Sequence, residues 1–212
     1  MAIDVNQVLV YRILPIENLE KDLPNGLFSK KNAPNDPTRI ILGNPEIIGE
    51  RDLRVVKCYP HTVVNDYVPF YFSVRTPMLY NIITGKGVPL RMQKDIVYIC
   101  CQLADLATEE FEWCFTDGNA AKKITDFYKK LARLDKIDWR SIKTTDFRID
   151  NADGDEDRIR KKHAEFLVKD HVPANKIKNI AVLNNNVKSI VEDTIQNCNL
   201  DIEVTVRPNY YF

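Results

Sequence analysis

The residues best suited to chemistry lie in one stretch, KKHAEFLVKDHVP, which spans positions 161–173. Apolar and polar residues alternate through HAEFLV, which predicts a short strand. That strand carries one carboxylate, Glu165, between apolar neighbours. A buried carboxylate is costly unless it is paired, hydrogen-bonded or used in a reaction. Glu165 therefore lies either on the solvent face of an amphipathic strand or in a functional site.

A run of basic residues, RIRKKH, immediately precedes this strand at positions 158–163. Such a run can contact the phosphates of a single-stranded nucleic acid, or it can simply be a solvated loop end. Lysine plus arginine and aspartate plus glutamate each number 30, so the formal net charge is zero. This balance argues against strong non-specific attraction to nucleic acid but is compatible with a local basic groove.

Several other kinds of site are excluded by spacing. The three histidines, His61, His163 and His171, show no metal-ligand pattern, so we expect no metal. No G-x-G-x-x-G, G-x-x-x-x-G-K-[ST] or G-x-S-x-G motif is present. The five cysteines form no C-x-x-C pair, and the N-terminus shows no signal-peptide pattern, so reduced thiols and a cytoplasmic location are expected. The apolar run from Ile96 is too short to span a membrane.

The elements that must position these residues alternate irregularly along the chain. Strands are predicted at 8–14, 66–73, 96–103, 112–117, 164–168, 179–183 and 200–208, and helices at 15–26, 77–84, 119–134 and 187–196. The absence of a steady strand–helix rhythm favours an α+β fold over a doubly wound α/β fold. A chain of 212 residues is expected to form a single domain over 1–212.

Cap residues and a proline give further detail on three of these predicted elements. Thr76 can cap the helix that starts at Pro77, and Gly85 can end it. Pro69 near the start of its strand suggests a sheet edge or a bulge. Asp117 can cap the helix predicted over 119–134. The apolar face of that helix would consist of Ala120, Ile124, Phe127 and Leu131.

A longer string, NDYVPFYFSVRTPMLYNIITG at 65–85, resembles the central signature of the DarT family of DNA ADP-ribosyltransferase toxins. Five further blocks follow the order that this family requires. They are VYRILPIENLEKDLPNGL (10–27), GNPEIIGERDLRV (43–55), FTDGNA (115–120), LDKIDW (134–139) and KKHAEFLVKDHVP (161–173). The closing pair Tyr210 and Tyr211 is also similar, and the blocks cover nearly the whole chain.

The resemblance implies an ADP-ribosyltransferase fold, a split, twisted β-sheet core with flanking helices that binds NAD without a glycine fingerprint. NAD is then the co-substrate, and no metal is needed. Glu165 matches the family's catalytic glutamate. Positive charge builds on the ribose as nicotinamide leaves, and a carboxylate there stabilises that charge and orients the 2′-hydroxyl.

Arg51 is the second catalytic residue that the resemblance implies. An arginine in GERDLR would otherwise be interpreted as a surface charge. In the family's NAD-binding loop, a guanidinium can hold a phosphate and stabilise negative charge on the acceptor base. Ile13 and Leu14 could instead be strand core, and Tyr71 a core aromatic residue. The implied NAD-binding set is Arg12, Ile13, Leu14, Gly26, Ser29, Arg51, Tyr71 and Met78.

The implied acceptor is thymine in single-stranded DNA, with guanine as an alternative, because a base inside a duplex cannot be attacked at its pairing edge. Asn119 stands where members of the family carry a histidine, so that residue's role is either lost or passes to the asparagine amide. The implied DNA-binding set is Arg75, Asn119, Arg148, Arg158, Arg160, Lys161 and Lys162.

The resemblance also implies a biological setting. Such enzymes are toxins that block replication, and a DarG-type antitoxin with a macrodomain removes their mark. We expect a monomer with no membrane association. Two other functions stay open, namely transfer to protein or RNA (or plain hydrolysis of NAD) and a non-catalytic module that binds single strands.

Overall fold

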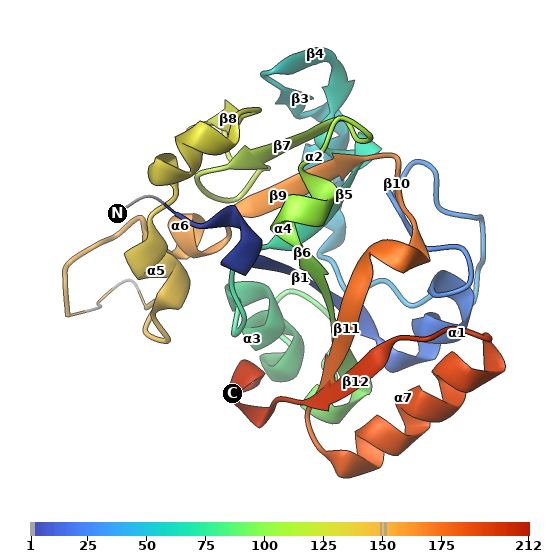
Figure 1. Ribbon diagram of the computed structural model, residues 1–212. Coiled ribbons are helices and arrows are strands. Elements are labelled where there is room, and N and C mark those ends of the chain that lie inside the picture. Colours follow the sequence, from blue (N-terminus) through green and yellow to red (C-terminus); the bar gives the residue numbers. More distant parts are fainter. Residues whose placement is uncertain (1–2, 149, 151) are drawn as a thin grey trace.

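A twisted, eight-stranded β-sheet forms the centre of the computed structural model, which describes residues 3–148, 150 and 152–212 (Figure 1). The strand order is β12-β11-β6-β1-β5-β9-β7-β8. Every neighbouring pair is antiparallel except β11 and β12, which are parallel. The strands are β1 (Leu9–Pro15), β5 (Tyr67–Tyr71), β6 (Ile96–Gln102), β7 (Trp113–Thr116), β8 (Phe127–Tyr128), β9 (Glu165–Lys169), β11 (Ile177–Val182) and β12 (Glu203–Val206).

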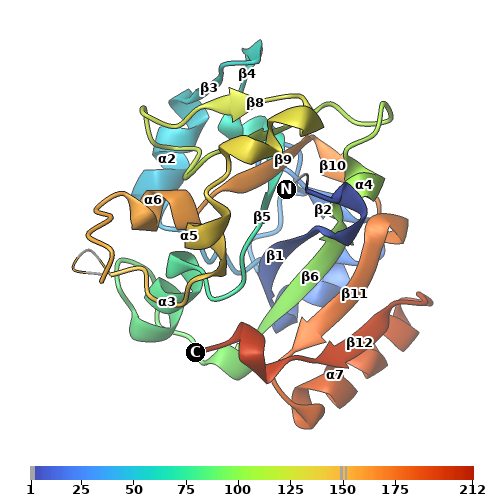
Figure 2. The same cartoon turned by 60° about the vertical axis from the view of Figure 1, so that its left-hand side comes forward.

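Two small ribbons and seven α-helices surround the sheet in the described part of the chain, together with short 3₁₀ helices. The ribbons pair β2 (Leu27–Phe28) with β10 (His171–Val172), and β3 (Val55–Val56) with β4 (Tyr59–Val63). The helices are α1 (Leu19–Asp22), α2 (Pro45–Leu53), α3 (Pro77–Thr84), α4 (Leu103–Leu106), α5 (Trp139–Lys143), α6 (Arg158–Lys162) and α7 (Asn185–Asn197). Figures 1 and 2 place α2 and α7 at opposite ends of the sheet.

Most of the predicted elements are confirmed, including the α+β class. α3 begins at Pro77, its cap Thr76 accepts a hydrogen bond from the Leu79 amide, and it ends at Gly85 with φ +69°. β6 is buried along its entire length, as its continuous apolar run predicts. No helix among the described residues is long and apolar enough to cross a membrane.

The helix predicted over 119–134 is wrong. The chain there forms an irregular loop, the two-residue strand β8 and a 3₁₀ helix at Leu131–Lys136. Arg54 explains the difference, because it donates to the carbonyls of Ala120, Lys122, Lys123 and Thr125. Those carbonyls would have to accept backbone amides in a helix. Ile124, predicted to face the core, is 72% exposed.

The sheet is split between β1 and β5. The two strands pair at one described position, Tyr11 with Tyr71, and diverge from there. Pro69 lies in the diverging part of β5, where its carbonyl accepts a hydrogen bond from Arg12 Nη1 at 3.2 Å. The amide and carbonyl of one antiparallel residue point to the same side, so the N–H that Pro69 lacks faces the split. The proline thus marks an open side of an interior strand, not the edge of the sheet.

The two faces of the sheet carry different hydrophobic clusters. The first cluster includes Phe70 and Phe166 and fills one face. The opposite face carries two separate clusters, one with Tyr98 of β6 beneath α3 and one with Leu167 of β9 beneath the β3–β4 ribbon. Glu165 alternates with Phe166, so its side chain lies on the face with two clusters, toward the gap between them.

Candidate active site

Glu165 lies in a strand whose two faces are both buried, so the prediction that its side chain faces solvent is wrong. Only 2% of it is exposed. Its two carboxylate oxygens accept hydrogen bonds from Arg51 in a fork, Nη1 to Oε1 at 3.1 Å and Nη2 to Oε2 at 2.9 Å. The Ala120 amide donates to Oε1 at 2.9 Å. A buried carboxylate that is fully hydrogen-bonded in this way keeps a defined orientation.

Arg51 reaches Glu165 from the last turn of α2. Asn44 caps this helix by accepting the amides of Glu46 and Ile47, and Pro45 occupies its first position. The C-terminal end of a helix favours a cation, which suits Arg51. Burial alone would lower the pKa of Arg51, but the Glu165 carboxylate more than reverses this effect and leaves the pKa raised. Arg51 is therefore a permanent cation.

Thr116 at the end of β7 fixes the backbone next to Glu165. Its buried hydroxyl accepts the Glu165 amide at 3.0 Å and donates to the carbonyl of Gly118 at 2.6 Å. This contact starts the irregular loop at 117–125, which then brings the Ala120 amide back to the carboxylate. Backbone and side chain of Glu165 are thus held by the same turn of chain.

Tyr71 lies beside Glu165, because the two residues are directly opposite in the β5–β9 register. Its hydroxyl donates to the Met78 sulfur at 2.9 Å, so two residues of the predicted NAD-binding set are in contact. Its ring lies 6.0 Å from the ring of His163. Burial raises the pKa of Tyr71 and lowers that of His163, so both are neutral near pH 7.

Arg12 occupies the split between β1 and β5. Besides its bond to Pro69, its Nε is buried and has no acceptor among the described residues. Burial lowers the pKa of Arg12 to about 10, against the opposing effect of Asp22. A half-buried cation with a buried, unused donor is well suited to a phosphate oxygen. The residues at the split therefore fit the pyrophosphate of a dinucleotide such as NAD.

The other predicted NAD-binding residues divide into two groups. Ile13 and Leu14 are buried in clusters on opposite faces of the sheet, so their side chains are core. Gly26 and Ser29 flank β2. Gly26 has φ +79°, and a Cβ there would lie 2.3 Å from the carbonyl oxygen of Val172. Ser29 is buried, and its amide donates to the Asp170 carbonyl at 2.8 Å.

Two cations of the predicted DNA-binding set are in the interior, contrary to the expectation of a phosphate-facing run. Arg158 is 4% exposed, donates to the Asp146 carbonyl and pairs with Asp153. Lys162 is 1% exposed and donates to the Ser73 hydroxyl at 2.9 Å and the Ile142 carbonyl at 3.0 Å. α6 turns both side chains inward, which the charge pattern alone does not reveal.

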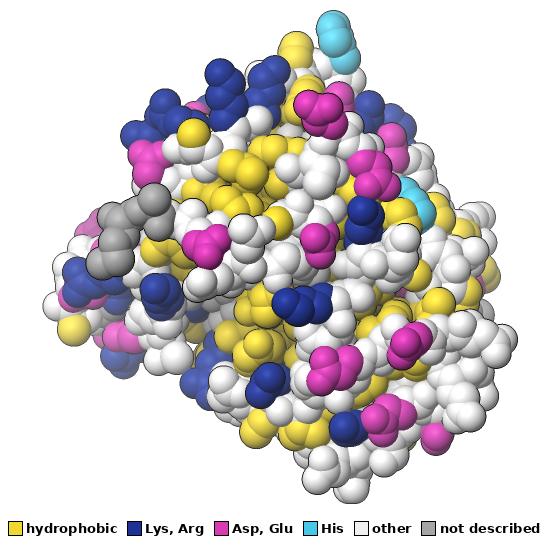
Figure 3. All heavy atoms as spheres, viewed as in Figure 1, with side chains coloured by type: hydrophobic (Ala, Val, Ile, Leu, Met, Phe, Trp, Pro, Cys, Tyr) yellow, Lys and Arg dark blue, Asp and Glu magenta, His cyan; other side chains and the backbone are white. Residues whose placement is uncertain are grey.

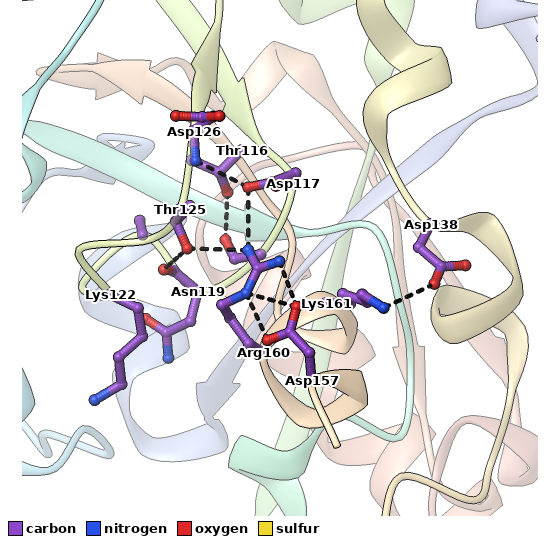
Figure 4. Close-up of polar contacts among 12 residues, drawn as sticks. Thr116, Asp117, Asn119, Lys122, Thr125, Asp126, Asp138, Asp157, Arg160 and Lys161 are labelled. Carbon is purple, nitrogen blue, oxygen red and sulfur yellow. Dashed lines mark hydrogen bonds and ion pairs between the residues drawn. The ribbon is translucent and has the colours of Figure 1, made fainter. Parts of the chain in front are cut away.

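The remaining two cations of the run are engaged by carboxylates. Lys161 Nζ lies 2.9 Å from Asp155 Oδ2. Arg160 pairs with Asp157 and Asp117, and only 14% of its side chain is exposed (Figure 4). The run is therefore mainly an internal ion-pair network rather than a solvated surface.

The other predicted DNA-binding residues are Asn119, Arg75 and Arg148, and each has different surroundings. Asn119 is half-buried and immediately precedes Ala120. Arg75, with φ +50°, lines a cavity of about 270 Å³ that Lys162 also lines. Arg148 pairs with Asp146 and lines a second cavity, of about 400 Å³, with Tyr80, Phe147 and Phe212.

Sequence reasoning missed the groups that orient Glu165. The Ala120 amide is a backbone donor, which no side-chain pattern reveals. Thr116 and Arg54 lie inside the similar blocks FTDGNA and GNPEIIGERDLRV, but nothing in their spacing indicates their partners. Among the described residues, no group of three His, Cys, Asp or Glu side chains could hold a metal ion.

Solved structures with the same architecture identify the class of protein. The DarT of Thermus sp. 2.9, in complex with ADP-ribosylated single-stranded DNA, is 26% identical and superposes with a TM-score of 0.87 over 97% of this chain and 96% of that chain. The same protein in complex with NAD⁺ superposes with a TM-score of 0.82 over 97% and 98% of the two chains. The split sheet thus has the fold of a DNA ADP-ribosyltransferase.

The particular family follows from the sequence comparisons. The family model described as ssDNA thymidine ADP-ribosyltransferase, DarT, matches residues 11–212. A DNA ADP-ribosyl transferase of Escherichia coli O127:H6 is 32% identical over 212 residues, covering 100% of this chain and 96% of the relative. One of Thermus aquaticus is 32% identical over 189 residues, covering 88% and 80%. The chain belongs to the DarT family, as the resemblance of its sequence blocks predicts.

Proposed function

We propose that this chain transfers ADP-ribose from NAD to thymine in single-stranded DNA, with Glu165 and Arg51 as the catalytic pair. The observation that carries the proposal is the buried, forked contact between these two side chains beside the split of the sheet. Membership in a family described as ssDNA thymidine ADP-ribosyltransferases supports the choice of reaction and acceptor. NAD⁺ bound to the similar Thermus protein supports the choice of co-substrate.

The two catalytic residues have different tasks in this reaction. The bond between nicotinamide and ribose C1′ breaks with its electron pair leaving on nicotinamide, and a bond from the base to C1′ forms. Glu165 stabilises the positive charge on the ribose and orients its 2′-hydroxyl. Arg51 stabilises negative charge on the base as the base releases its N–H proton to solvent water. Because its pKa is raised, Arg51 does not itself accept that proton.

The remaining residues of the two sets bind the substrates in this proposal. Arg12 holds the pyrophosphate, and the backbone at Ile13 and Leu14 lines the split. Gly26 and Ser29 shape the β2 end of the site, and Tyr71 packs on nicotinamide against Met78. Asn119 offers an amide to the acceptor base beside Glu165, in the place where the sequence resemblance implies a histidine. Arg75 and Arg148 contact the strand on either side of that base.

Mass spectrometry of defined oligonucleotides tests the reaction. The chain is incubated with NAD and a panel in which each oligonucleotide contains thymine, guanine or neither, alongside RNA and a protein extract. We expect an ADP-ribose adduct on thymine-containing DNA alone. Glu165→Gln, checked for folding by circular dichroism, should lower the rate about 10²–10³-fold. Labelling of guanine, RNA or protein instead, or unchanged labelling by the variant, would contradict the proposal.

We also propose a DarG-type macrodomain antitoxin as partner and the cytoplasm as the place of action. A Thermosipho africanus DarTG, in complex with ADP-ribose, shares the fold with a TM-score of 0.75, and the present chain covers 51% of it. The test is to add a DarG-type macrodomain to the modified oligonucleotide. Loss of the adduct supports the pairing, and a stable adduct argues against it.

A further inference from the structure

The loop at 117–125 supplies the backbone donor that orients the catalytic carboxylate. The Ala120 amide donates to Glu165 Oε1 at 2.9 Å, and Asn119 immediately precedes it. The loop contains no helix or strand. Its conformation is therefore held by contacts from outside, and those contacts decide where the amide points.

Arg160 of α6 contacts both ends of this loop (Figure 4). Its Nη1 donates to Asp117 Oδ1 at 3.1 Å, where the loop begins, and to Thr125 Oγ1 at 3.2 Å, where it ends. Its Nε and Nη2 donate to the Asp157 carboxylate at 2.8 and 2.6 Å, which fixes the guanidinium on α6. One planar group thus ties the two ends of the loop to the helix that leads into β9.

The backbone of Arg160 holds the middle of the loop. Its carbonyl accepts the Asn119 amide at 3.0 Å. Gly118 packs against the side chain so closely that an added Cβ would lie 2.3 Å from Arg160 Nη1. The Thr125 hydroxyl that accepts from Arg160 itself donates to the Asn119 carbonyl at 2.7 Å. These contacts hold the loop on both sides of Ala120.

Arg160 is committed to these partners by its charge. Its hydrogen bonds to Asp157, followed by the charge of Asp117, raise the pKa of its guanidinium despite burial. Turning toward a DNA phosphate would break contacts to both carboxylates and to Thr125. A partly buried arginine with this many charge-assisted bonds acts as a structural clamp.

We infer that Arg160 is a positioning residue for the transfer reaction, which holds the loop at 117–125 so that the Ala120 amide meets Glu165. The inference rests on the proposed function for the identity of the reaction. It replaces the role in DNA binding that the basic run suggests for this residue. Arg160 acts through Ala120 and does not touch NAD or the base. Displacing a catalytic group by about 1 Å can lower a rate about 10²-fold.

Steady-state kinetics of three variants form the first part of the test. Arg160→Met removes the hydrogen bonds and keeps an apolar stem. We expect kcat to fall about 10–10²-fold while KM for NAD stays within about threefold. Arg160→Lys should not rescue kcat, because one ammonium cannot reach Asp117, Thr125 and Asp157 together. The control is Lys176→Met, which removes another partly buried, ion-paired cation, bonded to Glu110, and should leave kcat unchanged.

The Ala120 amide resonance, followed by NMR on ¹⁵N-labelled protein, is the readout that a purely structural role would not move. We expect it to lie downfield in the wild type, as amides bonded to carboxylates do, and to move upfield in Arg160→Met but not in Lys176→Met. Thr125→Val, which removes one hydroxyl, gives the same test if Arg160→Met does not fold. An unchanged kcat in Arg160→Met, or a kcat restored in Arg160→Lys, would overturn the inference. A lower kcat in Arg160→Met with no movement of the Ala120 amide resonance would also overturn it. If the wild type modifies no DNA, the proposed function fails, and the amide shift still tests the clamp.

Discussion

At the scale of single residues, the Arg51–Glu165 pair is a buried ion pair whose partners depend on each other. Glu165 is 2% exposed, and 13% of the Arg51 side chain is exposed. Removing one member leaves an unpaired charge in the interior, whereas removing both leaves none. Stability and catalysis should therefore respond differently to single and double substitutions.

The first prediction separates these two responses. Arg51→Met and Glu165→Gln should each lower the free energy of unfolding, by about 3–5 kcal/mol for a fully buried pair and less here because Arg51 retains some solvent contact. The double variant should recover most of the loss, because the glutamine oxygen still accepts the Ala120 amide. Urea denaturation and transfer assays are the measurements. Additive destabilisation in the double variant would contradict the coupling, and a rate of transfer close to that of the wild type in any of the three would contradict the catalytic assignment.

Lys162 gives a second residue-scale prediction, on pH. Burial, followed by repulsion from Arg75, lowers the pKa of its amine from 10.5 to about 8 in the folded chain. Between these values the unfolded chain binds the proton and the folded chain does not, so stability from this group rises as pH increases. Relative to Lys162→Met, the wild type should gain stability from about pH 8 to about 10.5 and show no change below pH 8. A difference that is constant over this range would refute the shift.

At the scale of elements, short segments with special backbone geometry position the site more than regular helices do. The α3 caps and the buried strand β6 were predictable because local signals decide them. The loop at 117–125 was not, since its conformation depends on Arg54 and Arg160, which are far from it in sequence. Ala120 and Phe127 are buried, as the apolar spacing predicts, but the segment that carries them is not a helix.

Gly26 gives the element-scale prediction. With φ +79° and Val172 O only 2.3 Å from where a Cβ would lie, Gly26→Ala adds both backbone strain and a clash at the β2–β10 ribbon. Gly154→Ala is the matched control, because its φ is +65° and nothing lies within 4 Å. The control should cost about 1–2 kcal/mol and Gly26→Ala clearly more, with weaker NAD binding. Chemical denaturation and calorimetric titration with NAD measure both effects, and equal costs would show that the close approach is unimportant.

At the scale of the whole molecule, the charge is balanced but unevenly distributed. Figure 3 shows lysine and arginine side chains gathered over β8 and the 3₁₀ helix after it, where Lys129, Lys130 and Arg133 are exposed. The formal net charge of zero means that no long-range field draws DNA toward the chain as a whole. Binding must then come from a small number of local phosphate contacts.

The fourth prediction concerns salt. The logarithm of the affinity for a short single strand should fall with the logarithm of salt concentration, with a slope of about −0.7 for each phosphate contacted. A few contacts give a shallow slope of about −2 to −3. Fluorescence anisotropy with a labelled oligonucleotide at several salt concentrations measures it, with duplex DNA of the same sequence as the control. A much steeper slope, or equal binding of duplex, would contradict a local single-strand site.

The general architecture and the two residues of the proposed catalytic pair could be anticipated from ordered sequence blocks, and the structure places their side chains in contact. The inward orientation of Arg158 and Lys162 could not be anticipated in this way. A run of cations looks the same in sequence whether its side chains face solvent or buried partners. Contacts between residues far apart in the chain, rather than local pattern, decide between those two outcomes.

The split between β1 and β5 has a consequence for how this family can change. The separation of two strands is set by their backbone pairing and does not depend on the size of any one side chain. Tyr11 and Tyr71 are the described pair that joins the strands, and Pro69 offers no amide to bridge them, so this separation does not depend on the neighbouring side chains. Replacement of Arg12 would therefore remove its contact with Pro69 while the two strands stay apart.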